Sequence, residues 1–263
     1  MPTPNRAAGQ DPPTRNVVTL DLWLTLITEQ AFTSRGGVGR SRERLSRVMD
    51  ALASAGHPVD EDELEASFKR VQEDIDHAHA NGVDRTFQLW VRQIIDYTLP
   101  GLFDTLPDEA ADEIIAAVDE PFLAAPPVAH PKAGEVLSAL TEAGLRLALI
   151  SNTGFTSGDI YRRWFDDIGW RDRFEVTTFS NEAAVAKPTA SIFTSTLAEM
   201  NALPEQALHV GDNLLSDIAG AHRVGMCTAW ISGYDSREPE VEPDYVLEDL
   251  ADLPAVVERW RTP

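Results

Sequence analysis

The fold is predicted most directly from one stretch, Val17-Val18-Thr19-Leu20-Asp21-Leu22-Trp23-Leu24-Thr25-Leu26. Its first four residues are mostly β-branched or apolar, which is typical of a buried strand in a parallel sheet, and the run ends at an aspartate. An aspartate at a strand end is often only a turn residue, so alone it indicates little. It gains meaning from three later stretches: Ser151-Asn152, Lys187-Pro188, and Gly211-Asp212-Asn213-Leu214-Leu215-Ser216-Asp217.

Strands and helices alternate after residue 127. The pattern predicts strands at 146–150, 174–179, 208–210 and 227–231, and helices at 133–143, 190–200 and 216–224. Such alternation predicts an α/β protein with a doubly wound, Rossmann-like parallel sheet. Each of the four stretches follows or lies near the end of a predicted strand. Ligands bind at the carboxyl ends of the strands in such sheets, so we expect one site there.

The segment between the first strand and this region has helical periodicity. Helices are predicted at 41–55, 60–80, 84–97 and 107–123, separated by Gly, Pro and Asn. We therefore predict an all-helical cap domain at residues 28–127, inserted into a core domain of residues 16–27 and 128–263. Residues 1–15 hold four prolines and little apolar pattern, which predicts a disordered tail.

Composition narrows the class of protein. The 263 residues carry a formal net charge of −21, with 43% hydrophobic and 25% charged residues. So acidic a chain is a poor partner for nucleic acid or for an anionic membrane. No signal peptide is recognisable at the N-terminus, so we expect a cytoplasmic protein. The single cysteine, Cys227, lies in an apolar run and is expected to be a buried structural thiol.

Taken together, the four stretches resemble the haloacid dehalogenase-like (HAD) hydrolases of subfamily I, which carry a helical C1-type cap and attack phosphate esters with an aspartate. The resemblance implies that Asp21 is the nucleophile and that Thr25 steadies its loop. It also implies that Ser151, Asn152 and Lys187 bind the phosphoryl group, with Lys187 neutralising charge around Asp21. The implied partner is a small phosphate ester.

The fourth stretch indicates a metal. Two carboxylates, Asp212 and Asp217, would join Asp21 in an oxygen-rich site suited to Mg²⁺. The resemblance further implies that the backbone carbonyl of Trp23 reaches the metal, a role that needs no particular side chain.

Trp23 departs from the family pattern. Phosphatases of this family usually carry a second aspartate there, and an indole can neither protonate a leaving group nor activate water. General acid–base help contributes about 10²–10⁴-fold to a rate, so we expect slow turnover or a preference for good leaving groups. Two alternatives stay open. One is a metal-independent 2-haloacid dehalogenase, against which Asp212 and Asp217 count. The other is a catalytically impaired scaffold that binds a phosphorylated ligand or a protein partner.

The predicted cap begins with a cluster of basic residues. Arg40, Arg42, Arg44 and Arg47 lie close together in an acidic chain. A solvated helix face is the expected arrangement, although one of these side chains could instead reach a substrate anion.

Overall fold

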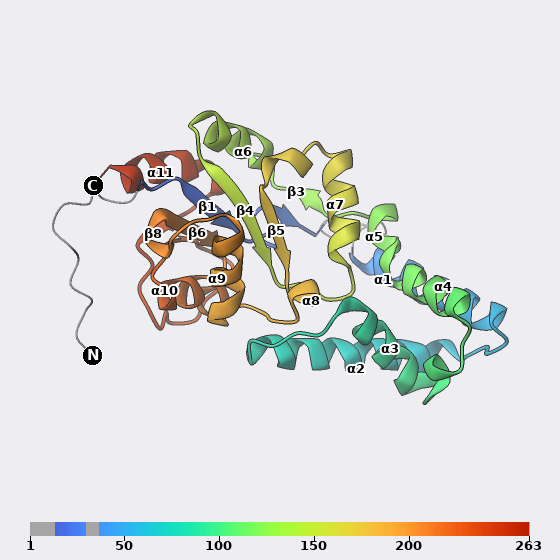
Figure 1. Cartoon of the computed structure of the whole chain (residues 1–263). Coiled ribbons are helices and arrows are strands. Elements are labelled where there is room, and N and C mark those ends of the chain that lie inside the picture. The colour runs from blue at the N-terminus through green and yellow to red at the C-terminus, as the bar shows by residue number, and fades with distance from the viewer. Residues whose placement is uncertain (1–13, 30–36, 263) are drawn as a thin grey trace.

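The computed structural model describes residues 14–29 and 37–262. A six-stranded parallel sheet lies at its centre, in the order β5-β4-β1-β6-β7-β8 (Figure 1). The strands are β1 (Val17–Leu20), β4 (Arg146–Ser151), β5 (Val176–Phe179), β6 (Ala207–Gly211), β7 (Cys227–Ile231) and β8 (Tyr245–Leu247). Counted along the chain, this is the 3-2-1-4-5-6 order of a doubly wound sheet, so the predicted fold class is confirmed.

Both faces of the sheet are covered. In β4, Leu147 and Leu149 belong to one apolar cluster, whereas Ala148 and Ile150 belong to another, because alternate side chains of a strand point to opposite faces. Helices α6 (Ala133–Glu142), α7 (Gly158–Asp167) and α11 (Leu253–Arg261) contribute to the first cluster. Helices α9 (Ala190–Glu199) and α10 (Gly220–Arg223) contribute to the second.

A helical segment interrupts the sheet domain. It contains α1 (Gly37–Ser54), α2 (Glu61–Ala80), α3 (Phe87–Thr98), the 3₁₀ turn η1 (Leu102–Asp104), α4 (Asp108–Asp119) and α5 (Pro121–Ala124). These helices project from one end of the sheet (Figure 1). The apolar residues of α1 to α4 and η1 form a third cluster, against which Phe155 of the sheet domain packs, whereas Phe122 of α5 belongs to the first cluster. The flanking chain segments pair as the antiparallel strands β2 (Ile27–Thr28) and β3 (Val128–Ala129).

Several element boundaries differ from the predicted ones. The helix predicted at 107–123 is two helices, because Pro121 lacks the backbone N–H that would continue α4 and instead begins α5. The helix predicted at 216–224 begins as the π-helix η4 (Leu214–Ala219), where the Asn213 side chain accepts two backbone N–H bonds at the start. The pattern did not indicate α7, β8, α11, or the short elements α8 (Ser180–Ala183), η2 (Arg171–Arg173), η3 (Pro204–Gln206) and η5 (Leu250–Asp252).

The structure describes only the end of the predicted tail, and it does not test the predicted domain boundaries. Residues 1–13 lie outside the described residues, whereas Arg15 Nη1 donates to the carbonyl of Trp260 at 2.5 Å. The boundaries at residues 28 and 127 stay predictions. No helix in the described part of the chain is both long and apolar enough to cross a membrane.

Candidate active site

The four stretches meet at one edge of the sheet. Asp21 follows β1, Ser151 ends β4, and Asp212 follows β6. β1 lies between β4 and β6, and the chain reverses its winding direction there, which is where doubly wound sheets bind ligands. Lys187 reaches the same edge through α8 and the loop that follows it.

Lys187 links two carboxylates at the centre of the site. Its Nζ donates to Asp21 Oδ1 at 2.5 Å and to Asp217 Oδ1 at 2.6 Å, and its side chain is 2% exposed. Burial disfavours the ammonium charge, but the two carboxylates outweigh burial and raise the pKa of Lys187. Lys187 is therefore a fixed cation beside Asp21.

The pKa values of the two carboxylates move in opposite directions. Burial raises the pKa of Asp21 to about 6, and Lys187 offsets only part of this. Burial acts on Asp217 too, but Lys187 and His209 outweigh it and hold the pKa of Asp217 well below its usual range. Asp217 has more donors: Lys187, His209 Nε2 at 3.1 Å and the backbone N–H of Asn213 at 3.0 Å.

His209 was not expected from the sequence. It is fully buried in β6, and burial lowers its pKa. With a neutral ring, Nε2–H donates to Asp217, and Nδ1 accepts from the hydroxyl of Thr19 at 2.8 Å. The available signal was a polar residue within a strand whose other residues are all apolar or glycine. Gly211 matters for the same carboxylate, because a Cβ there would lie 2.3 Å from Asp217 Cγ.

Asp212 completes a group of three carboxylates. One oxygen each from Asp21, Asp212 and Asp217 lies within 4.8 Å of the others. Burial raises the pKa of Asp212 to about 8, with further contributions from the charges of Asp21 and Asp217. The Asp212 carbonyl accepts from Trp230 Nε1 at 2.8 Å, which holds this residue against β7. Lys187 bonds to only two of these three carboxylates, so the cluster can accept a further cation.

Asn152 contacts the backbone of Lys187. Its Nδ2 donates to the Lys187 carbonyl at 3.0 Å, and its Oδ1 accepts from the Lys187 N–H at 2.9 Å. The fully buried Ser151 donates from Oγ to the Asn152 carbonyl at 3.3 Å. Among the described residues, neither side chain is hydrogen-bonded to any of the three clustered carboxylates. Asn152 thus fixes the position of the lysine backbone.

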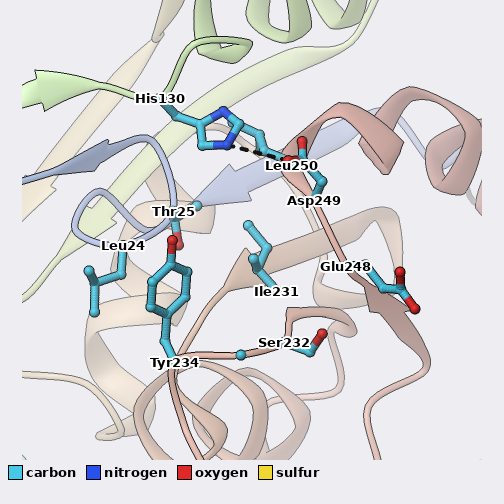
Figure 2. A pocket seen from close by; sticks show the side chains of 10 residues that line it. Leu24, Thr25, His130, Ile231, Ser232, Tyr234, Glu248, Asp249 and Leu250 are labelled. Carbon is cyan, nitrogen blue, oxygen red and sulfur yellow. Dashed lines mark ion pairs between the residues drawn. The ribbon is translucent and has the colours of Figure 1, made fainter.

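Thr25 lies apart from these contacts. It is 2% exposed, and within the described ranges its Oγ1 has no hydrogen-bond partner. Thr25 also lines a cavity of about 250 Å³ (Figure 2). This cavity contains the ion pair of His130 Nε2 with Asp249 Oδ2, which are 3.7 Å apart. None of the three clustered carboxylates lines it, so it is separate from the site.

The Trp23 side chain contacts aromatic residues. Its Nε1 donates to the hydroxyl of Tyr161 on α7 at 2.9 Å, and Tyr161 stacks on Phe179 with ring centroids 5.0 Å apart. The guanidinium carbon of Arg40 lies 5.8 Å from the Trp23 ring centroid. The single donor of the indole is therefore already used.

The expected solvated face is wrong for two of the four arginines. Arg40 and Arg44 are 7% and 6% exposed. Arg40 pairs with Glu29 and donates to the carbonyl of Ala125 at 2.9 Å, so it connects both chain segments that join the helices to the sheet domain. Arg42 is exposed, as predicted.

Arg44 connects the helical segment to the sheet domain. Its Nε donates to the carbonyl of Val118 near the end of α4 at 2.6 Å, and its Nη2 donates to the carbonyl of Phe155 at 3.0 Å. Burial lowers its pKa to about 10, so the guanidinium keeps its charge at neutral pH. Desolvated backbone carbonyls, which need a donor, explain the burial.

The Cys227 side chain is half-buried rather than buried as expected, and its thiol pKa is raised to about 12, first by burial and then by Asp244. A thiol with so high a pKa is unreactive at neutral pH, in agreement with a structural role.

Comparison with known proteins assigns the class. The profile of the haloacid dehalogenase-like hydrolases matches residues 16–225. The chain therefore belongs to the haloacid dehalogenase-like hydrolase family, as the four stretches indicated, and it is a hydrolase of that family.

Relatives with described activities include phosphatases. A glyceraldehyde 3-phosphate phosphatase of Methanopyrus kandleri is 30% identical over 224 residues, which is 82% of this chain and 89% of the relative. A phosphoserine phosphatase of Thermus thermophilus is 30% identical over 125 residues, 47% of this chain and 49% of the relative. The chain thus spans about half the length of the latter relative.

Solved structures confirm the fold. A 2-haloacid dehalogenase from Pseudomonas syringae pv. Tomato matches with a TM-score of 0.62 at 21% identity, covering 93% of this chain and 99% of the other. A HAD phosphatase from Thermococcus onnurineus matches with a TM-score of 0.57 at 22% identity, covering 92% and 97%.

Proposed function

We propose that the protein is a Mg²⁺-dependent phosphate-ester hydrolase that reacts through an aspartyl-phosphate on Asp21. The observation that carries this proposal is the placement of a buried lysine between Asp21 and Asp217, with Asp212 beside them. A carboxylate held next to a fixed cation can approach an anionic phosphoryl group with less repulsion. The phosphatases among the relatives support the same substrate class.

The reaction has two displacements. In the first, an Asp21 oxygen bonds to phosphorus, the bond from phosphorus to the ester oxygen breaks, and the leaving alkoxide takes a proton from water. In the second, water attacks phosphorus, the bond to Asp21 breaks, and inorganic phosphate leaves as the proton of the water passes to solvent. Splitting one transfer into two is the usual gain of covalent catalysis. Lys187 and the Ser151 hydroxyl bind the phosphoryl oxygens, Asn152 holds the lysine loop, and Thr25 steadies the nucleophile loop.

The cluster of three carboxylates has the ligand chemistry that a magnesium ion requires. Mg²⁺ prefers carboxylate and water oxygens, and Lys187 bonds to only two of the three carboxyl groups. Asp21, Asp212 and Asp217 would hold the ion together with the backbone carbonyl of Trp23. When bound, the ion supplies positive charge to the phosphoryl oxygens.

Isothermal titration calorimetry tests this metal site. Mg²⁺ titrated with the phosphate mimic fluoroberyllate is expected to bind to the wild type and not to Asp212→Asn, because the amide loses the charged ligand. Asp167→Asn, at an exposed position of α7, is the control and should bind as the wild type does. Equal binding by wild type and Asp212→Asn would reject the site.

The absence of a side-chain acid at Trp23 shapes the expected activity. We propose that esters with good leaving groups are hydrolysed faster than alkyl esters, because the former need no protonation. The substrate is a small molecule, and neither nucleic acid nor a membrane is an expected partner of a chain with a net charge of −21. A cytoplasmic location is part of the same proposal.

One activity screen distinguishes the proposed function from the two alternatives. A metal-independent 2-haloacid dehalogenase would release halide from 2-haloacids in EDTA, and a non-enzymatic scaffold would hydrolyse nothing. The proposed function predicts phosphate release that requires Mg²⁺ and that Asp21→Asn abolishes. Halide release in EDTA, or no turnover of any phosphate ester, would contradict it.

A further inference from the structure

A turn of the helical segment contacts the loop that carries Lys187. We call residues 81–86, between α2 and α3, the cap turn, and residues 184–189 the lysine loop. Val83 and Val185 form an antiparallel bridge. On either side of it, the Asp84 N–H donates to the Ala184 carbonyl at 3.4 Å, and the Ala186 N–H donates to the Gly82 carbonyl at 3.2 Å. The two segments thus pair as a miniature sheet.

A side chain of the lysine loop adds a stronger contact. Thr189 is the N-cap residue of α9, a position where a threonine hydroxyl commonly accepts from a helix N–H. No such bond is present here, and Thr189 Oγ1 instead donates to the Gly82 carbonyl at 2.7 Å. Gly82 has a φ of +69°, and a Cβ there would lie 1.9 Å from Thr189 Oγ1. This close contact therefore requires glycine.

The cap turn is rigid on its own side. Asp84 is 7% exposed and accepts from Trp90 Nε1 at 2.7 Å, from the Arg85 N–H at 2.6 Å and from His79 Nε2 at 2.9 Å. A buried carboxylate with this many donors fixes the backbone around it. The turn consequently contacts the lysine loop as a preformed surface.

Asn152 of the sheet domain holds the lysine loop at a second point, the backbone of Lys187. Asn152 bonds to both the N–H and the carbonyl of Lys187, directly after the residue that pairs with Gly82. The ammonium then has its fixed position between Asp21 and Asp217. The loop backbone is thus held between the cap turn and Asn152.

We propose that the cap turn is a positioning element for Lys187: docking of Gly82 on Thr189 and Ala186 holds the lysine loop so that Nζ reaches Asp21, and undocking loosens this arrangement. The catalytic consequence rests on the role proposed above for Lys187. The coupling itself concerns only the contacts of the loop, and it is measurable without turnover.

Chemical labelling of lysines measures the coupling directly. The chain has three lysines, and Lys69 and Lys132 have side chains 70% and 50% exposed, so they serve as internal references for the 2% exposed Lys187. We compare rates of acetylation by an N-hydroxysuccinimide ester, peptide by peptide, by mass spectrometry. Thr189→Val removes the hydroxyl at similar volume, Thr189→Ser keeps it, and Thr194→Val removes an exposed hydroxyl from the same helix.

Lys187 is expected to react roughly twofold to tenfold faster in Thr189→Val than in the wild type, because one lost hydrogen bond changes an equilibrium by about that factor. Thr189→Ser and Thr194→Val should label as the wild type does, and Lys69 and Lys132 should not change in any variant. Gly82→Ala should give a larger increase. An unchanged Lys187 rate in both Thr189→Val and Gly82→Ala, with normal melting transitions, would overturn the proposal.

Kinetics with p-nitrophenyl phosphate separate this proposal from the proposed function. A positioning role predicts a lower kcat for Thr189→Val with rescue by Thr189→Ser, beyond any change in KM. If no variant, wild type included, hydrolyses phosphate esters but the labelling rates differ as expected, the phosphatase function fails and the coupling stands. If hydrolysis occurs and kcat is unchanged in Thr189→Val, the positioning role fails.

Discussion

The residue with the largest effect on the expected chemistry is Trp23. Its indole donates to Tyr161 and packs against Arg40, so the side chain contributes to packing between the loop after β1, α7 and the helical segment. These contacts give the tryptophan a structural reason to be there. They also mean that a replacement at this position disturbs an aromatic group as well as the site.

Replacing Trp23 with aspartate tests whether only the acid–base residue is missing. We expect Trp23→Asp to raise hydrolysis of an alkyl phosphate, by up to about 10²–10⁴-fold, and that of p-nitrophenyl phosphate much less, because p-nitrophenolate leaves without a proton. The ratio of kcat/KM values for the two substrates is the measurement.

Trp23→Phe is the matched control, because it removes the indole N–H without supplying an acid. Both variants lose the bond to Tyr161, and Trp23→Asp also loses the aromatic packing, so its melting transition should fall further than that of Trp23→Phe. A folded, Mg²⁺-binding Trp23→Asp that gains on neither substrate would favour a different chemistry or a binding role.

Buried arginines stabilise the packing of the helical segment. Arg44 on α1 donates to Val118 of α4 and to Phe155 of the sheet domain. We expect Arg44→Met to lower the free energy of unfolding by about 2–4 kcal/mol, because two buried carbonyls lose their donor. Urea denaturation measures this. Arg42→Met, at an exposed position of the same helix, should change it by less than about 0.5 kcal/mol; similar losses in both variants would contradict the interpretation.

The end of α4 should make stability depend on pH. Asp119 accepts from the Ser157 N–H at 2.8 Å and from its Oγ at 2.5 Å. Burial nevertheless raises the pKa of Asp119 to about 6, with Arg44 opposing and Asp159 adding to the increase. The folded protein thus binds this proton more tightly than the unfolded chain. The stabilisation that this protonation of Asp119 gives the folded protein is complete below about pH 4 and is lost as the pH rises through about 6.

Asp119→Asn removes this titration. Between pH 4 and pH 7, the free energy of unfolding of the wild type should fall by roughly 1–3 kcal/mol relative to that of the variant. Urea denaturation at several pH values gives the difference, and Asp112→Asn, exposed on the same helix, controls for net charge. A difference between wild type and Asp119→Asn that stays constant with pH would show that Asp119 does not titrate in this range.

At the scale of the whole molecule, the helical segment has an apolar cluster of its own, distinct from the two clusters on the faces of the sheet. This separation supports the proposed division into a cap domain and a core domain. The two are nevertheless joined by polar contacts, including Arg44 to Phe155 and Thr189 to Gly82.

Limited proteolysis tests the division. We expect a non-specific protease to cut first near the predicted junctions, at about residues 28 and 127, because junctions between domains have fewer buried contacts than helices. Mass spectrometry of the early fragments identifies the sites. First cuts within α1 to α4 would contradict an independent cap, and digestion in urea provides the unfolded reference.

The class of fold, the family and the residues that meet at the sheet edge could all be predicted from the sequence. Alternating strands and helices, with a chemical residue at each strand end, are local patterns, and the geometry of a parallel sheet brings such ends together. Asp21, Lys187 and Asp217 could therefore be placed in one site from the sequence alone, and their roles stay predictions. Long periodic helices were equally visible, apart from the break at Pro121.

Contacts between separate elements could not be predicted and became visible in the folded structure. The burial of Arg40 and Arg44, the bond of His209 to Asp217, and the docking of Gly82 on Thr189 join residues whose separation along the chain varies from 8 to 107. The burial of a polar side chain depends on which carbonyl or carboxylate packing places next to it, and a residue type does not carry that information. For this reason the proposed nucleophile, Asp21, could be identified from the sequence, whereas the neighbours that set its pKa and hold Lys187 in place could not.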